Sequence, residues 1–274
     1  MAVSSDTVTA DPLAPLLDLP GVAEASTLAR QALAKAHQHK TNRRGWPVSA
    51  AEASLRSARA SAVLDGGPTQ VDETAPTNPV FAGSLRVTQA LEGGETTLVE
   101  VWRRAPLQAI AKLHMLAAAD LVDDDDQLGR PRLDEQVGRR LGMLADLVTG
   151  GTDAPAPVLA AVAHGELLTL APFGTADGVV ARAVSRLITI SSGLDPHGLG
   201  VPELSWMRAV GKYRQGAQGF ATGTPEGLAT WLVLCAKALQ SGAGEAVSIA
   251  ESAGKVADGS AHAVVDQMKR AAPR

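Results

Sequence analysis

The chain has 274 residues, of which 45% are hydrophobic and 20% are charged, and its formal net charge is −4. This balance offers no basic field for nucleic acid, and no stretch approaches the ~18 uncharged apolar residues that span a bilayer. The polar N-terminus lacks the basic and apolar segments of a signal peptide. We therefore expect a soluble, cytoplasmic protein with no nucleic-acid partner and no membrane partner.

Aromatic residues make up 3% of the chain, so a core must be built mainly from Ala, Leu and Val. Ala and Leu are good helix formers, which favours an all-α protein. The one cysteine, Cys235, excludes an internal disulfide framework and fits a reducing compartment. Its apolar neighbours indicate a packed core thiol rather than a nucleophile.

The N-terminal half predicts an arm followed by helices with short connections. Residues 1–12 are expected to be disordered, and a polar connector is expected over 69–78. A loop over 41–47 precedes Ser49, which forms a capping box with Glu52 and so marks a helix start. Apolar spacing and terminating Gly and Pro residues predict helices over 22–39, 49–64, 79–91, 97–104 and 106–121.

The C-terminal half continues the helical pattern after a charged loop over 123–132. We expect helices over 133–148, 157–170, 179–190, 202–215, 225–240 and 244–269. No alternating strand pattern and no internal repeat is evident. The sequence therefore predicts an all-α fold with a loop at 171–178 between two of its helices.

That loop and the helix after it carry the most informative motif. Residues 171–182 read Ala-Pro-Phe-Gly-Thr-Ala-Asp-Gly-Val-Val-Ala-Arg. The segment resembles the signature of the Fic (Fido) family, His-Pro-Phe-x-[Asp/Glu]-Gly-Asn-Gly-Arg-x-x-Arg. The spacing is kept, as are Pro172, Phe173, Gly178 and Arg182.

Other features follow the same order as in that family, over roughly residues 55–240. They are Leu113-His114 inside a helix, Gly129-Arg130-Pro131-Arg132 as a Gly-x-x-Arg, and His164 seven residues before the loop. The resemblance implies a Fic-like helical bundle with extra N- and C-terminal helices. It also allows a small β-hairpin flap near 72–78. The corresponding division is a 1–45 arm and helix, a 46–100 helical region, a 101–242 Fic-like core and a 243–274 C-terminal helix.

The positions that carry the family's chemistry have changed. Ala171 stands where the family has its histidine base, Thr175 where it has the metal-binding acid, and Val179 where it has the first arginine. Asp177 replaces the asparagine and would repel a phosphate. We therefore expect no catalytic residue in this loop and a protein that is more plausibly inactive than an AMP transferase.

What remains is a helix N-terminus suited to an anion, next to cationic side chains. The nucleotide or anion site that the resemblance implies comprises Phe173, Gly174, Asp177, Gly178, Arg182 and Arg186. The alternative for the two arginines is a structural salt-bridge face, and the sequence leaves both interpretations open.

Upstream, Ser61-Ala-Val-Leu-Asp65-Gly66 resembles the family's inhibitory motif [Ser/Thr]-x-x-x-Glu-[Gly/Asn]. The resemblance implies that Asp65 faces Arg182, which otherwise holds the γ-phosphate of ATP. Alternatively, Asp65 only ends a helix before Gly66. The sequence does not choose between these roles.

No other residue makes a convincing base or metal ligand. His164 on an apolar face is typical of a core histidine, and neither Asp195 nor His197 is a strong candidate for the base. His37 and His39 lack companion ligands, so we expect no metal site. The acidic run from Asp124 to Glu135 mimics a calcium loop only in part, because Leu128 stands at an oxygen-ligand position.

Two hypotheses follow. The first is a catalytically degenerate Fic-fold protein that acts as a regulatory or protein-interaction module, with an unidentified protein partner and residual nucleotide binding. The second is an autoinhibited AMP transferase that uses ATP, with Mg²⁺ as its cofactor, and a hydroxyl acceptor. The resemblance allows a homodimer in either case.

Overall fold

The computed structural model describes residues 10–68, 78–93 and 96–271, with side chains described up to residue 255. The described residues form helices joined by turns, with no strand among them, which confirms the all-α prediction. Residues 1–9 of the expected arm, and the expected flap up to residue 77, lie outside the described residues. No helix in the described part of the chain is long and apolar enough to cross a membrane.

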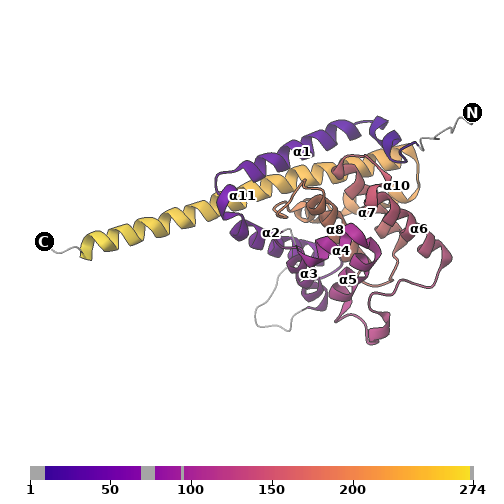
Figure 1. The fold of residues 1–274 in the computed structure, drawn as a ribbon, viewed down its shortest axis with the longest axis horizontal. Coiled ribbons are helices and arrows are strands. Elements are labelled where there is room, and N and C mark those ends of the chain that lie inside the picture. Colours follow the sequence, from indigo (N-terminus) through magenta and orange to yellow (C-terminus); the bar gives the residue numbers. More distant parts are fainter. Residues whose placement is uncertain (1–9, 69–77, 94–95, 272–274) are drawn as a thin grey trace, which may run out of the picture.

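Eleven α-helices make up the described fold (Figure 1). They are α1 (Val22–Gln38), α2 (Asn42–Leu64), α3 (Pro79–Ala90), α4 (Thr97–Arg104), α5 (Pro106–Ala118), α6 (Glu135–Asp146), α7 (Ala156–Leu170), α8 (Asp177–Ser191), α9 (Pro202–Arg208), α10 (Val210–Ala221) and α11 (Pro225–Ala271). Short helical turns lie at η1 (Ala14–Asp18), η2 (Asp125–Gln127) and η3 (Leu147–Gly151).

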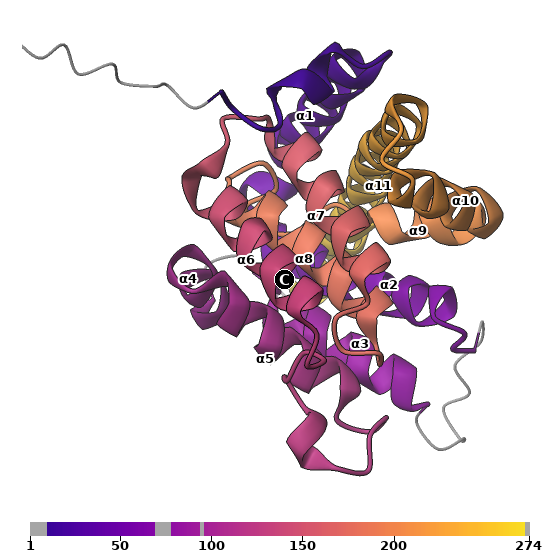
Figure 2. The same ribbon diagram turned by 90° about the vertical axis from the view of Figure 1, so that its right-hand side faces the viewer.

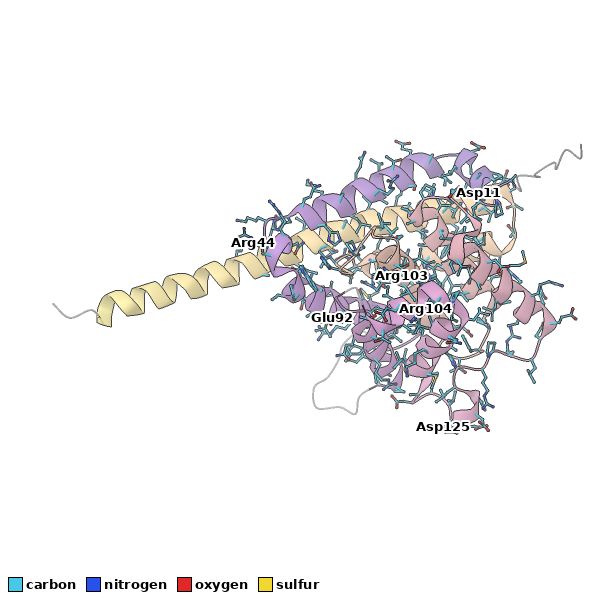
Figure 3. The ribbon with its side chains drawn as sticks, viewed as in Figure 1. Asp11, Arg44, Glu92, Arg103, Arg104 and Asp125 are labelled. Atoms are coloured by element: carbon cyan, nitrogen blue, oxygen red, sulfur yellow. The ribbon has the colours of Figure 1, made fainter. Side chains whose placement is uncertain are left out.

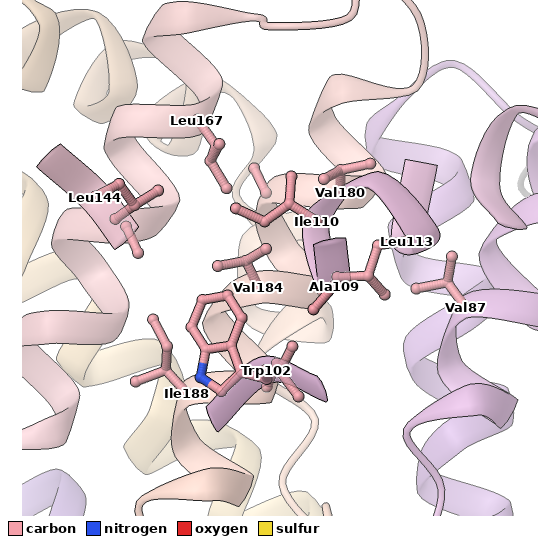
Figure 4. Close-up of a cluster of buried hydrophobic side chains, with 14 of the residues drawn as sticks. Val87, Trp102, Ala109, Ile110, Leu113, Leu144, Leu167, Val180, Val184 and Ile188 are labelled. Atoms are coloured by element: carbon pink, nitrogen blue, oxygen red, sulfur yellow. The ribbon is translucent and has the colours of Figure 1, made fainter. Parts of the chain in front are cut away.

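Helix α8 lies at the centre of the bundle, with α7 along one side and α4 and α5 across from it (Figure 2). All of its residues from Val179 to Ile190 are buried. Its apolar side chains join a cluster with residues of α4, α5, α6 and α7, among them Ile110, Leu144 and Leu167 (Figure 4). Burying each such side chain contributes about 1.5–3 kcal/mol, so this cluster fixes the position of α8 and of the loop that precedes it.

Helix α11 is one continuous helix, so the two helices expected over 225–240 and 244–269 were wrong. It runs beside α1 and then extends beyond the body of the fold (Figure 1). The glycine at 242 does not break the helix. A Cβ atom there would lie 2.6 Å from the backbone nitrogen of Pro202, so this glycine lets α11 approach α9 closely.

Three other expectations also need correction. Helix α2 starts at Asn42 rather than Ser49, with a kink at Gly45, and Ser49 is buried inside the helix instead of capping it. The helix expected over 202–215 is divided into α9 and α10 at Ala209, whose backbone leaves the helical region. Asp11, which is labelled in Figure 3, is not disordered. Its carboxylate accepts hydrogen bonds from the Thr152 hydroxyl (2.7 Å) and the Asp153 N–H (2.8 Å).

The packing of α11 against α9 predicts that Gly→Ala substitutions at two nearby positions change the free energy of unfolding in opposite directions. Gly242→Ala should lower the free energy of unfolding by about 1–3 kcal/mol, because the new methyl group meets backbone. Gly244 has no atom within 4 Å of its missing Cβ, so Gly244→Ala should raise it by about 0.5–1 kcal/mol through helix propensity. Urea unfolding of both variants measures the difference. Equal effects at the two positions would contradict the close approach.

Candidate functional site

The loop between α7 and α8 has an unusual backbone. Ala171 (φ +43°) and Ala176 (φ +54°) adopt the left-handed conformation, as does Gly174 (φ +77°). A residue with a Cβ atom is disfavoured there by about 1–2 kcal/mol. Such strain persists only where the surrounding structure enforces it, and it clusters at functional sites.

Arg132 enforces the path of the loop from the connection between α5 and α6. Its backbone N–H donates to the carbonyl of Pro172 (2.8 Å), and its side chain donates to the carbonyls of Ala171 (3.1 Å) and Leu170 (2.9 Å). The last carbonyls of a helix lack partners within the helix. Arg132 therefore both caps α7 and fixes the turn that follows it.

Phe173 fixes the middle of the loop by stacking on His114 of α5. The ring centroids are 4.0 Å apart and the ring planes differ by 7°. His114 Nδ1 accepts a hydrogen bond from the Gly129 N–H (2.9 Å), so its proton sits on Nε2. Burial lowers the pKa of His114, which keeps the ring neutral in this role.

Asp177 closes the loop at the start of α8. Its Oδ1 accepts a hydrogen bond from the Phe173 N–H (3.0 Å). Burial raises the pKa of Asp177 despite this bond, and the nearby Asp65 charge raises it further. The Asp177 side chain therefore holds the loop together through a hydrogen bond, and ionising its carboxyl group costs free energy.

Arg182 of α8 is buried, with 2% of its surface exposed, and its guanidinium meets three side chains. Its Nη2 pairs with Asp65 Oδ1 (2.9 Å) and donates to the Ser61 carbonyl (3.0 Å). Its Nε donates to Ser61 Oγ (2.9 Å), and its Nη1 donates to the Tyr213 hydroxyl (3.3 Å). The structure thus contains the pair that the resemblance implied, made through one carboxylate oxygen.

Asp65 also ends α2, so its two suggested roles coincide. It is the C-terminal cap of that helix, and Gly66 follows it in the left-handed conformation (φ +86°). The inhibitory-like motif therefore places Ser61, one turn earlier, and Asp65 on the same guanidinium.

Tyr213 extends the network to His164. The His164 Nε2 lies 2.8 Å from the Tyr213 hydroxyl, which also accepts from Arg182. Burial and then the charge of Arg182 lower the pKa of His164 well below its ordinary value, so the ring stays neutral. Burial raises the pKa of Tyr213 to about 12, so its hydroxyl keeps its proton and can donate it to His164. Burial alone would lower the pKa of the Arg182 guanidinium, but the neighbouring Asp65 and Tyr213 outweigh this effect and raise the pKa of Arg182.

The Asp65 carboxylate also lies against the first turn of α8. A Cβ atom on Gly178 would clash with the Asp65 carboxylate, so a side chain at this position would have to displace that carboxylate. The N-terminus of a helix favours anions through its unpaired N–H groups and its dipole. A carboxylate of the protein itself lies beside that position.

A cavity of about 350 Å³ borders this point. It is lined by Asp65, Val80, Leu121, Gly174, Ala176, Asp177, Gly178 and Val179. The charged side chains among these described residues are both acidic, and Arg182 is not among them. The charge that these side chains bring to the cavity is therefore negative.

Arg186 lies apart from the loop and has the structural role that the sequence left open. Its guanidinium pairs with Glu203 (3.1 Å) and donates to the Gly198 carbonyl (3.0 Å) and to the Ser57 hydroxyl. Both Arg186 and Glu203 are buried. The pair with Glu203 joins α8 to α9, and the hydrogen bond to Ser57 joins α8 to α2.

None of the alternative bases lines the cavity. His164 is fully buried on Tyr213, and His197 stacks on Trp46 with the ring centroids 4.1 Å apart. Asp195 is buried and accepts from the Leu199 N–H (2.9 Å) while pairing with His37 (2.8 Å).

Sequence reasoning missed Tyr213 and Glu203, which complete the two buried arginine sites. Tyr213 is the one tyrosine of the chain and lies 31 residues from Arg182. No local pattern marks either residue, since their partners come from a distant part of the sequence.

No family model matches the chain, and no curated protein matches it. Among solved structures, it is similar to the crystal structure of a Fic family protein from Desulfovibrio desulfuricans G20, with 17% identity and a TM-score of 0.53. The match covers 84% of this chain and 74% of that one. The chain therefore has a Fic/Fido-like fold. At this identity the likeness establishes the fold, and the activity has to be argued from the site.

The contact between Gly178 and Asp65 predicts a coupled pair of substitutions. Gly178→Ala should lower the free energy of unfolding by about 1–3 kcal/mol, because its methyl group displaces the carboxylate from Arg182. In an Asp65→Ala background the same change should cost much less. A double-mutant cycle by urea unfolding measures this coupling, and additive effects would show that the two residues do not touch.

The raised pKa of Asp177 predicts that Asp177→Asn stabilises the protein in a pH-dependent way. An amide oxygen can still accept from Phe173, and the variant avoids ionising a buried carboxyl group. Because the folded-state pKa lies above the ordinary 3.8, the variant should melt at a higher temperature than the wild type at neutral pH. The difference should vanish below pH 3.8, where Asp177 is protonated in both states. A gain that is the same at all pH values would contradict this cause.

Proposed function

We propose that this chain is a catalytically degenerate Fic-fold protein that acts as a regulatory or protein-interaction module. The observation that carries the proposal is the position of Asp65. Its carboxylate pairs with Arg182 and lies against the α8 N-terminus, the place where the resemblance puts nucleotide phosphate. The chain supplies its own anion at that place.

The chemistry of the loop supports this proposal. AMP transfer needs a base for the acceptor hydroxyl and a ligand for the divalent cation. It also needs donors for the charge on phosphorus. Ala171 cannot accept a proton, and Val179 is buried in the core cluster instead of pointing a cation at the cavity. Losing a base alone costs about 10²–10⁴ in rate, and here the arginine is replaced as well.

The residues present do not fit ATP and Mg²⁺ as the site stands. The triphosphate would meet two carboxylates in the cavity, while the remaining arginine is covered by Ser61, Asp65 and Tyr213. Asp177, the carboxylate nearest the loop, already accepts from the Phe173 N–H.

Recognition remains as a function for such a site. The loop keeps its strained shape through Arg132, Phe173 and Asp177, none of which needs substrate to hold it. A rigid loop beside a cavity is a suitable surface for a protein partner. We propose that this face binds one.

The second candidate is the autoinhibited AMP transferase, and the Asp65–Arg182 pair also favours it. In that case removing Asp65 would free Arg182 and the α8 N-terminus for phosphate. The acceptor would be a protein hydroxyl, and the base would come from outside the loop. The two candidates differ in whether covalent transfer ever occurs.

Labelling with ATP in the presence of Mg²⁺ separates the two candidates. We expect no covalent AMP on wild type, on Asp65→Asn or on Asp65→Ala, by intact-mass spectrometry. Asp65→Asn keeps a hydrogen-bond acceptor for Arg182 and so guards against simple unfolding, which circular dichroism checks. Labelling that increases in the two variants would overturn the degenerate assignment and establish the transferase. Calorimetry with ATP–Mg²⁺ on the same variants reports whether binding survives without transfer.

A further inference from the structure

A second and larger groove lies between α9, α10 and α11. Its volume is about 1070 Å³, and Pro20, just before α1, forms part of its rim. Figure 2 shows α11 between α1 and α10, with α9 beside α10. The groove is separate from the loop cavity, since the two share no lining residue.

The floor of the groove is apolar. Ala229, Val233 and Leu234 line it from α11 at helical spacing, and Gly216 and Trp206 line it from α10 and α9. Val233 and Leu234 are half-buried, so apolar surface remains accessible there. Small-molecule sites are typically concave and apolar, with a few polar groups that orient the ligand.

The acidic and the basic side chains of the groove lie at opposite ends of it. Those among its described lining residues are Lys212, Glu226 and Lys237. Helices α10 and α11 are joined by the turn at 222–224. Glu226 therefore lies at the turn, while Lys212 and Lys237 lie about three helical turns away from it, at the other end. Both lysines are exposed, and neither forms an ion pair with a described residue.

Trp206 lies in the wall of the groove with a donor that is unpartnered among the described residues. Trp206 has 3% of its surface exposed, and its indole N–H finds no acceptor in the described part of the structure. Buried polar groups are nearly always hydrogen-bonded, so this one is an exception, but its nitrogen is covered and does not face the open groove. The two lysines are cationic donors, which matches an acid.

We propose that the groove binds an amphiphilic carboxylate, such as a medium-chain acyl acid. The apolar chain lies along Ala229, Val233 and Leu234, and the carboxylate lies between Lys212 and Lys237. Glu226 at the opposite end disfavours the reversed orientation, because like charges repel.

Tyr213 is the shared wall between this groove and the loop site. It lines the groove, and its hydroxyl accepts from Arg182. The proposal concerns ligand binding alone and stands whether or not the assigned function of the loop is correct.

Calorimetric titration of the full chain with dodecanoate tests the proposal. We expect saturable binding to one site, below the concentration at which dodecanoate forms micelles. Dodecyltrimethylammonium, a cation with a chain of the same length, should bind about ten-fold more weakly, because attraction to two lysines becomes repulsion. Equal affinity for the two probes, or no saturation by dodecanoate, would overturn the proposal.

Three variants assign the binding to this groove. The double variant Lys212→Glu, Lys237→Glu should weaken dodecanoate binding by at least about ten-fold and remove the preference for the anion. Thr230→Trp, at an exposed lining position, should fill the groove and weaken the binding of both dodecanoate and dodecyltrimethylammonium. Lys112→Glu, on the exposed face of α5, should leave the affinity for both probes unchanged. An equal loss in Lys112→Glu, or binding of an acidic amphipathic peptide without dodecanoate binding, would contradict the assignment.

Discussion

The buried guanidinium of Arg182 is the constraint on which much of this structure depends. An uncompensated buried charge costs several kcal/mol, so each side of the guanidinium needs a partner. Asp65 and Ser61 come from α2, and Tyr213 comes from α10. These contacts fix where α2 ends and link α10 to α8 through the Tyr213 hydroxyl. They also explain why position 178 is glycine, since Asp65 lies directly over it.

The loop before α8 is shaped by interactions that are independent of any reaction. Arg132 holds its carbonyls, Phe173 stacks on His114, and Asp177 binds the loop backbone. The strained geometry of this loop therefore needs neither a catalytic side chain nor a ligand to hold it. Val179 shows how closely the loop and the core are joined, because it belongs to the core cluster and also borders the cavity by the loop.

The same side chains that stabilise the bundle also connect its two concave regions. Tyr213 touches the larger groove with its ring and Arg182 with its hydroxyl. A ligand in the groove would thus lie one side chain away from the Asp65–Arg182 pair. The charged lining residues of the loop cavity are acidic, whereas those at one end of the groove are basic, so the two concave regions differ in electrostatic character.

By itself the sequence determined the all-α content, most helix positions and the loop motif, because apolar periodicity and terminating Gly and Pro residues act over a few residues. The pairing of Asp65 with Arg182 was implied only through resemblance, and the anion at Gly178 was not foreseen. Tertiary structure decided which charges are buried and by what. Arg186 meets Glu203, Arg182 meets Tyr213, and Gly242 continues α11 instead of ending it. Each of these depends on a neighbour from another helix, and local sequence does not say which helix that will be.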